Sequence, residues 1–211
     1  MDIFETRNER YAKRVIEQLR RRHYEAYHCP SAADVLSKVK ELIPEGSTVT
    51  WGGSMTIRDI GLTRMLKEGN YKVFDRDEAQ SRDEADAIYR KAFECDFYLS
   101  SANAMSEDGQ IVNIDGTGNR IAALSWGPKR VIYVISLHKV CHDLDAAVKR
   151  ARYTAAPVNT TRFPSDTPCH LDGACHDCKS PDSSCVYFYI QRLSKPANRH
   201  IVILTDGQWG Y

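Results

Sequence analysis

The sequence has no apolar run that approaches the roughly 20 residues a helix needs to cross a membrane. Its opening residues, MDIFETRNERYAKR, are charged and lack the apolar segment of a signal peptide. An excess of charge of one sign is also missing, because 29 Lys and Arg are balanced by 28 Asp and Glu, for a formal net charge of +1. Attraction to nucleic acid or to an anionic membrane is therefore not expected. We predict a cytoplasmic protein with no nucleic-acid partner and no membrane span.

Internal repeats, low-complexity tracts and interdomain linkers are absent as well. The 211 residues suffice for one α/β domain with a substantial core. A hydrophobic content of 42% and a charged content of 27% are ordinary for a soluble globular protein. Residues 1–211 are therefore predicted to form a single domain.

Apolar periodicity predicts strands that alternate with helices. Residues 1–22 are expected to form an amphipathic helix, with Tyr11, Val15 and Leu19 at helical spacing. Strands are expected over 24–28, 48–51, 71–74, 96–100, 131–135 and 200–204, and further helices over 31–43, 54–69, 82–93 and 143–155. This alternation indicates βαβ units in a mainly parallel sheet with right-handed crossovers.

The least ordinary part of the sequence lies between residues 99 and 135. Two short apolar segments, 110–114 and 120–124, are joined by Asp-Gly-Thr-Gly-Asn. Asp-Gly between alternating apolar residues is a strong hairpin signal, because the turn needs positive φ and glycine reaches it without a Cβ clash. We therefore predict an antiparallel hairpin, inserted into the parallel sheet, with these two segments as its arms.

Polar residues in this hairpin exceed what a turn requires, and they point to an anion site. Glycines expose backbone N–H groups, and the guanidinium of Arg120 would complete an anion-binding concavity. The turn Gly-Gly-Ser-Met-Thr at 52–56 lies between a strand and a helix, where anions also bind. Plain turn closure by side chains is the alternative for both motifs. The residues predicted to bind the anion are Gly52, Gly53, Ser54, Thr56, Asn103, Asp115, Gly116, Thr117, Gly118, Asn119 and Arg120.

Four of the seven cysteines fall within seventeen residues of a Cys-rich loop predicted over 157–186. In a reducing compartment such a cluster indicates metal or redox chemistry. The irregular spacing around a single Cys-x2-Cys favours a [4Fe–4S] cluster, whereas structural zinc usually has paired short knuckles. Zinc and a thiol–disulfide pair remain as alternatives. The predicted metal ligands are Cys169, Cys175, Cys178 and Cys185, while Cys29, Cys95 and Cys141 are expected to pack in the core.

The run NAMSEDGQIVNIDGTGNRIAAL followed by GPKRV resembles the LUD domain of the lactate-utilisation protein C family. GGSMT and the cysteine cluster fit the same family, and the resemblance covers most of the chain from about residue 10. It implies a fold related to ribose-5-phosphate isomerase and CoA-transferase domains, with a Rossmann-like sheet and an inserted hairpin. His138-Lys139, after the strand at 131–135, departs from the Asn-Lys that the family tends to have.

The resemblance implies a redox accessory protein in the oxidation of L-lactate to pyruvate. The anion site would bind a small molecule, the cysteines would hold the cluster, and iron–sulfur proteins would be the partners. One alternative is an enzyme on a phosphorylated or CoA-linked substrate with a structural zinc, for which Glu107 is a candidate nucleophile by similarity to CoA-transferases. The other is a non-catalytic ligand-binding module, and no residue pattern assigns a catalytic group.

Overall fold

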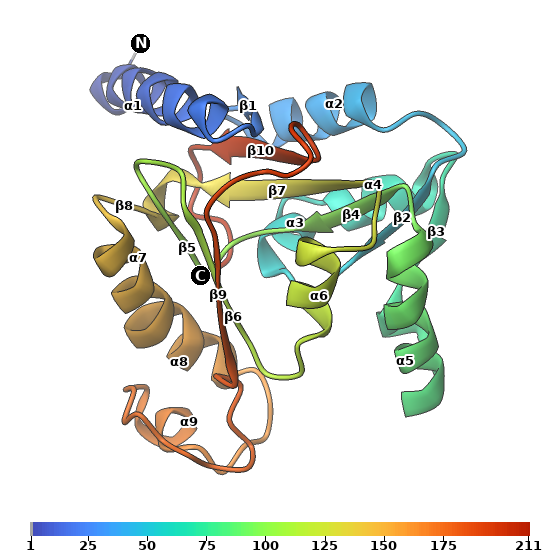
Figure 1. Cartoon of the computed structure of the whole chain (residues 1–211), viewed down its shortest axis with the longest axis vertical. Coiled ribbons are helices and arrows are strands. Elements are labelled where there is room, and N and C mark those ends of the chain that lie inside the picture. Colours follow the sequence, from blue (N-terminus) through green and yellow to red (C-terminus); the bar gives the residue numbers. More distant parts are fainter. Residues whose placement is uncertain (1) are drawn as a thin grey trace.

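Strands and helices alternate along most of the chain in the computed structural model, which describes residues 2–211 (Figure 1). The helices are α1 Ile3–Arg21, α2 Ala32–Leu42, α3 Met55–Asp59, α4 Leu62–Glu68, α5 Arg82–Lys91, α6 Asn119–Ser125, α7 Leu144–Arg150, α8 Ala156–Thr160 and α9 Pro168–Asp172. The strands are β1 Glu25–His28, β2 Thr48–Trp51, β3 Lys72–Phe74, β4 Phe97–Ser100, β5 Ala104–Ser106, β6 Ile111–Asp115, β7 Arg130–Ser136, β8 Val140–Cys141, β9 Tyr187–Gln191 and β10 His200–Thr205. The predicted α/β class is confirmed.

The large sheet has six strands in the order β1-β10-β7-β4-β2-β3, and every neighbouring pair is parallel. Alternate residues of the inner strand β7 enter different cores: Val131 and Tyr133 belong to one cluster, Ile132 and Val134 to the other. A strand buried on both faces requires an uninterrupted apolar run, which is the pattern that predicted this strand.

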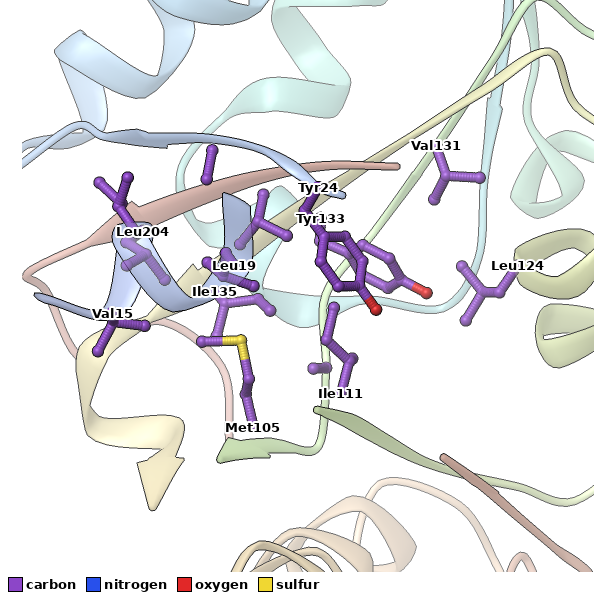
Figure 2. Close-up of a cluster of buried hydrophobic side chains, with 14 of the residues drawn as sticks. Val15, Leu19, Tyr24, Met105, Ile111, Leu124, Val131, Tyr133, Ile135 and Leu204 are labelled. Carbon is purple, nitrogen blue, oxygen red and sulfur yellow. The ribbon is translucent and has the colours of Figure 1, made fainter. Parts of the chain in front are cut away.

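Different elements cover the two faces of the large sheet. On one face, Val15 and Leu19 of α1 pack with Met105 and Ile111 of the small sheet, as Figure 2 shows around the ring of Tyr133. On the other face, α2, α3 and α4 contribute a separate cluster of aliphatic side chains. The helices therefore leave the ends of the strands free to carry the loops of a site.

The small sheet has the order β8-β5-β6-β9 and mixed strand directions. β5 and β6 form an antiparallel pair, joined by a turn in which the Gly109 N–H donates to the Ser106 carbonyl at 2.8 Å. The outer face of this sheet packs on α7 and α8 through Ala104, Val112 and Ala156. In Figure 1 the segment with α9 projects from the end of the molecule opposite α1.

The predicted hairpin is wrong in its second arm. Residues 111–115 form β6 as expected, but 119–125 form helix α6, and the actual hairpin is β5–β6. The carboxylate of Asp115 accepts the backbone N–H groups of Gly118 and Ile121, both at 3.2 Å. This carboxylate satisfies orphan donors at the start of α6, so the Asp-Gly signal marks a helix start rather than a strand turn.

The Cys-rich loop is also shorter and more ordered than the predicted 157–186. The helical path continues past residue 155 through a π-helical turn, Ala151–Ala155, into α8. That turn places Pro157 in the first turn of α8, where a missing N–H costs little. Helix α9 lies within the remaining segment, and β9 follows it. None of the helices in residues 2–211 combines the length and the apolar character that crossing a membrane would take.

Replacing Leu19 by Ala should lower the free energy of unfolding by about 2–5 kcal/mol, because the side chain is 0% exposed and its loss leaves a cavity between α1 and the sheet. Urea denaturation monitored by circular dichroism measures the change. Ile3→Ala is the control on the same helix, since Ile3 is 77% exposed and its truncation should cost no more than about 0.5 kcal/mol. Equal effects of the two substitutions would contradict this packing.

Candidate functional site

A cavity of about 300 Å³ lies where the parallel strands of the large sheet end. Ser54 and Thr56 follow β2, Arg76 follows β3, Ser101 follows β4 and Lys139 follows β7. Ligands in open α/β sheets bind at this carboxyl edge. The cavity is therefore the candidate functional site of the chain.

The structure brings most of the predicted anion ligands together in this cavity. Those that line it are Gly53, Ser54, Thr56, Asn103, Asp115, Gly116, Thr117, Asn119 and Arg120. Gly52 and Gly118 do not line the cavity. The two glycine turns are more than 60 residues apart in the sequence, and the fold places them on one site. Their role in ligand binding stays a prediction.

Positive charge dominates the lining. The cationic side chains are Arg76, Arg120, Lys139 and Arg162, whereas Asp115 is the one acidic side chain among the described lining residues. The carboxylate of Asp115 already has partners within the protein, because it accepts backbone N–H groups at the start of α6 and lies 3.7 Å from Nε of Arg120. Arg76 pairs with Asp77 at 3.5 Å. Arg162 and, when protonated, Lys139 are therefore the lining cations without an ion-pair partner among residues 2–211, and they make the cavity suited to an anionic ligand.

The concavity expected around 115–120 is filled by the protein itself. Besides Gly118 and Ile121, the N–H of Thr117 also donates to Asp115, at 3.3 Å. The backbone donors that we expected to hold a ligand anion thus hold the side chain of Asp115. A ligand in the cavity would therefore not find the N–H groups of Thr117, Gly118 and Ile121 free.

Arg120 is held in place by the hairpin. Its Nη1 donates to Oδ1 of Asn113 at 2.9 Å, and its Nη2 donates to Oδ1 of Asn103 at 3.4 Å and to the carbonyl of Ile114. Hydrogen bonds of this kind fix a guanidinium with little loss of entropy on ligand binding. The polar residues of the central stretch therefore orient a cation at the cavity wall.

The glycines of the turn at 52–56 make room for side chains. A Cβ at Gly53 would lie 2.6 Å from Nη2 of Arg76, and one at Gly52 would lie 2.8 Å from Oη of Tyr98. The missing Cβ at Gly53 leaves the space in which the guanidinium of Arg76 lies close to the backbone. Sequence reasoning expected such an approach from a ligand, and the structure shows it from a cation that lines the site.

Lys139 is the deepest cation, with 2% of its surface exposed. Its Nζ donates to Oγ1 of Thr56 at 2.8 Å and to Oγ of Ser101 at 3.4 Å, and no carboxylate of residues 2–211 lies within ion-pair distance. Burial, followed by the nearby guanidinium of Arg150, lowers the pKa of Lys139 to about 7. The amine therefore exists partly in its neutral form near neutral pH.

Sequence reasoning did not identify several lining residues. It named Lys139 only within the His138-Lys139 pair that follows the strand at 131–135, and it gave no role to Arg76, Arg162 or Tyr211. For Arg76 the available signal was its position after a predicted parallel strand. For Arg162 and Tyr211 no local signal existed, because α8 and the segment after β10 bring them to the cavity only through the tertiary fold.

The neighbour of Lys139, His138, does not line the cavity. Burial lowers the pKa of His138 to about 4, so its imidazole is neutral at physiological pH. Glu107 is likewise remote from the cavity, because it accepts a hydrogen bond from Tyr11 at 3.1 Å and pairs with Arg14 of α1 at 3.2 Å. The candidate nucleophile of the CoA-transferase alternative is thus bound in a structural network.

The clustered cysteines share a second cavity, of about 60 Å³. All four are partly buried, Cys169 on α9, Cys175 and Cys178 after it, and Cys185 before β9. Burial and the three other thiols raise the pKa of Cys185 to about 11, which reflects how near the sulfurs lie. However, among residues 2–211 no three His, Cys, Asp or Glu side chains are arranged closely enough to hold a metal ion.

The two histidines of the segment are engaged elsewhere. Nδ1 of His170 lies 3.2 Å from the Thr160 carbonyl, and Nε2 of His176 lies 2.6 Å from the carboxylate of Asp172. The thiols are therefore the donor set of this cavity. Its wall is shared with the first cavity, because Ala156 and Ser184 line both.

Comparison with known proteins agrees with the sequence resemblance. A model of the LUD domain matches residues 12–205. No curated protein sequence matches the chain. A crystal structure of a DUF162 family protein from Deinococcus radiodurans is similar over 94% of this chain and 98% of that one, with a TM-score of 0.56 and 12% identity. At that identity the likeness shows the fold alone.

Two further structures resemble only part of the chain. Ribose 5-phosphate isomerase A from Neisseria gonorrhoeae is similar over 52% of each chain, with 16% identity and a TM-score of 0.34. The eIF2B beta protein from Chaetomium thermophilum is similar over 54% of this chain and 43% of that one, with 15% identity and a TM-score of 0.40. Likenesses this low carry no argument about the ligand.

The stability of the protein should depend on the charge of Lys139. Because its folded pKa of about 7 is below the ordinary 10.5, the unfolded chain binds more protons between these values. The free energy of unfolding of the parent, relative to Lys139→Met, should therefore rise with pH from 7 towards 10.5, by at most about 1.4 kcal/mol per pH unit. Urea denaturation between pH 7 and 9.5 measures this slope. Lys149→Met, at an exposed site, should give no such slope, and a flat Lys139 difference would contradict the assignment.

Proposed function

Because the chain belongs to the LUD domain family, a family associated with lactate utilisation, we propose that it is a redox accessory protein in the oxidation of L-lactate to pyruvate. In this proposal the cavity at the carboxyl edge binds an anionic small molecule. The cysteine segment holds an iron–sulfur cluster, and iron–sulfur proteins are the partners. The observation that carries the proposal is the surplus of cations in the cavity.

The cations suit a small carboxylate. Arg120 is fixed by hydrogen bonds to Asn103 and Asn113. Nη1 of Arg162 donates to Oδ1 of Asn159 at 3.1 Å, and no carboxylate side chain of the described chain lies within ion-pair distance of Arg162. Planar guanidinium groups match a carboxylate in two parallel hydrogen bonds. A volume of about 300 Å³ is at the lower end for ligand pockets, which favours a small ligand.

The donor set of the second cavity supports the cluster proposal. Four partly buried thiols face one space. Cys169, Cys175, Cys178 and Cys185 would be the ligands, and a [4Fe–4S] cluster bound there would supply one-electron transfer. Ala156 and Ser184 form a common wall, so the cluster would lie next to the anion cavity.

Arg162→Gln should weaken the binding of pyruvate and L-lactate about tenfold, because it removes a charge-assisted hydrogen bond worth about 1.5–3 kcal/mol. Isothermal titration calorimetry of the full chain measures the dissociation constants. Arg64→Gln, at an exposed arginine of α4 outside the cavity, is the matched control and should leave binding unchanged. Absence of binding to the parent, or equal effects of the two substitutions, would overturn the anion site.

Protein purified without oxygen should contain iron and acid-labile sulfide, with a broad visible absorption band. Cys175→Ser should lose both, because it removes one of four cluster ligands. Cys141→Ser, at a thiol outside the cysteine cavity, should retain them. Stoichiometric zinc without sulfide would contradict the cluster and support the structural zinc, whereas neither metal in the parent would contradict both.

A further inference from the structure

We propose that Lys139 is a nucleophile that forms a Schiff base with an anionic carbonyl compound bound in the cavity. The anionic group is a carboxylate beside the carbonyl, as in a 2-oxo acid, or a phosphate, as in a sugar phosphate. This inference rests on the proposed function, because the arginines of the cavity would hold the anionic group. Lys139 would supply an amine rather than a charge.

Lys139 differs from the ion-paired lysines of the protein. Five lysines lie within ion-pair distance of a carboxylate near the surface: Lys38, Lys67, Lys91, Lys129 and Lys149. Lys139 is 2% exposed, and its described neighbours within hydrogen-bond distance are hydroxyl groups. Keeping an ammonium buried without a counter-ion costs several kcal/mol, roughly, so the surroundings select a neutral amine.

The hydrogen bonds around Nζ leave a lone pair for reaction. Oγ1 of Thr56 donates to the Trp209 carbonyl at 3.1 Å, so its own hydrogen is used. Thr56 therefore accepts a hydrogen bond from Nζ, which lies 2.8 Å away. A neutral amine that donates to Thr56 and Ser101 keeps its lone pair unshared. The pKa of about 7 makes this form available at physiological pH.

Gly210 lies close to Lys139 and Thr56, where a side chain would not fit. A Cβ at Gly210, whose φ is +64°, would lie 3.1 Å from Nζ and 2.5 Å from Oγ1 of Thr56. The backbone after β10 thus packs directly on this pair and fixes the amine at the cavity wall. Tertiary contacts of this kind hold a reacting group in one position.

The proposed step balances without an oxidant or a reductant. The lone pair of Nζ adds to the carbonyl carbon to form a C–N bond, and the carbonyl oxygen takes up a proton. Loss of that oxygen as water, with a second proton, leaves a protonated imine. Overall, amine, carbonyl compound and one proton give an iminium and water. Ser54 and Tyr211 line the same cavity, and we assign these proton transfers to their hydroxyl groups.

The test is reductive trapping with the full chain. Pyruvate and glyceraldehyde 3-phosphate are the two probes, and sodium cyanoborohydride converts an imine into a stable secondary amine. Peptide mapping by mass spectrometry should find the adduct on Lys139 with one of the two probes, which identifies the carboxylate or the phosphate class. Acetone and glyceraldehyde, the matched neutral carbonyl compounds, should be trapped at least about tenfold more slowly, because they lack the group that the arginines bind.

Two further readouts separate a nucleophile from a buried structural lysine. The trapping rate should rise as the pH increases through 7, because the neutral amine is the reacting form. Lys139→Arg should abolish the adduct, while Lys149→Arg should leave it unchanged. Peptide mapping of the trapped parent protein identifies the modified lysine without any variant. The proposal can therefore be tested even if Lys139→Arg does not fold.

Adducts confined to exposed lysines, with Lys139 unmodified by both probes, would overturn the inference. Calorimetric binding of pyruvate that Arg162→Gln weakens would show, in that case, that the anion site stands and only the Schiff base fails. No binding of any anion would instead show that the proposed function itself fails. Equal trapping of charged and neutral carbonyl compounds at Lys139 would overturn the anionic class of substrate.

Discussion

The rest of the structure depends on the burial of β7 on both of its faces. The strand is hydrogen-bonded to β4 on one side and to β10 on the other, and its side chains enter two separate cores. Parallel strands in one sheet must all end at the same edge. Residues that follow β2, β3, β4, β7 and β10 therefore meet around one cavity, although they are spread over more than 150 positions.

The chemical character of this cavity follows from which charges the protein satisfies by itself. The carboxylate of Asp115 is used at the start of α6, and it also keeps Arg120 in position. The other charged side chains of the lining are cations, and Lys139 is hydrogen-bonded to hydroxyl groups. An internal anion thus organises the wall, and the excess of positive charge is left for a ligand.

Much of the fold could be predicted because its signals are local. The strands at 48–51 and 131–135 and the helix capped by Ser31 lie where periodicity and capping residues place them. The errors arose where one local signal has two outcomes. Asp-Gly occurs both in hairpin turns and at helix starts. Here the Asp115 carboxylate accepts the N–H groups of Gly118 and Ile121, and a helix begins. Proline usually ends a helix, but here the π-helical turn Ala151–Ala155 precedes Pro157 and the helical path continues.

The sequence by itself determined the α/β class, the family and the candidate ligand motifs, because each depends on neighbouring residues or on a contiguous run. Only the tertiary structure decided which cations share the cavity, that Asp115 is already satisfied, and that Ser184 separates the cysteines from the anion site. It also decided that Lys139 is buried with no carboxylate side chain within ion-pair distance. These properties depend on distances between segments remote in the chain, and such distances are set by packing on both faces of the sheet, which no local pattern encodes.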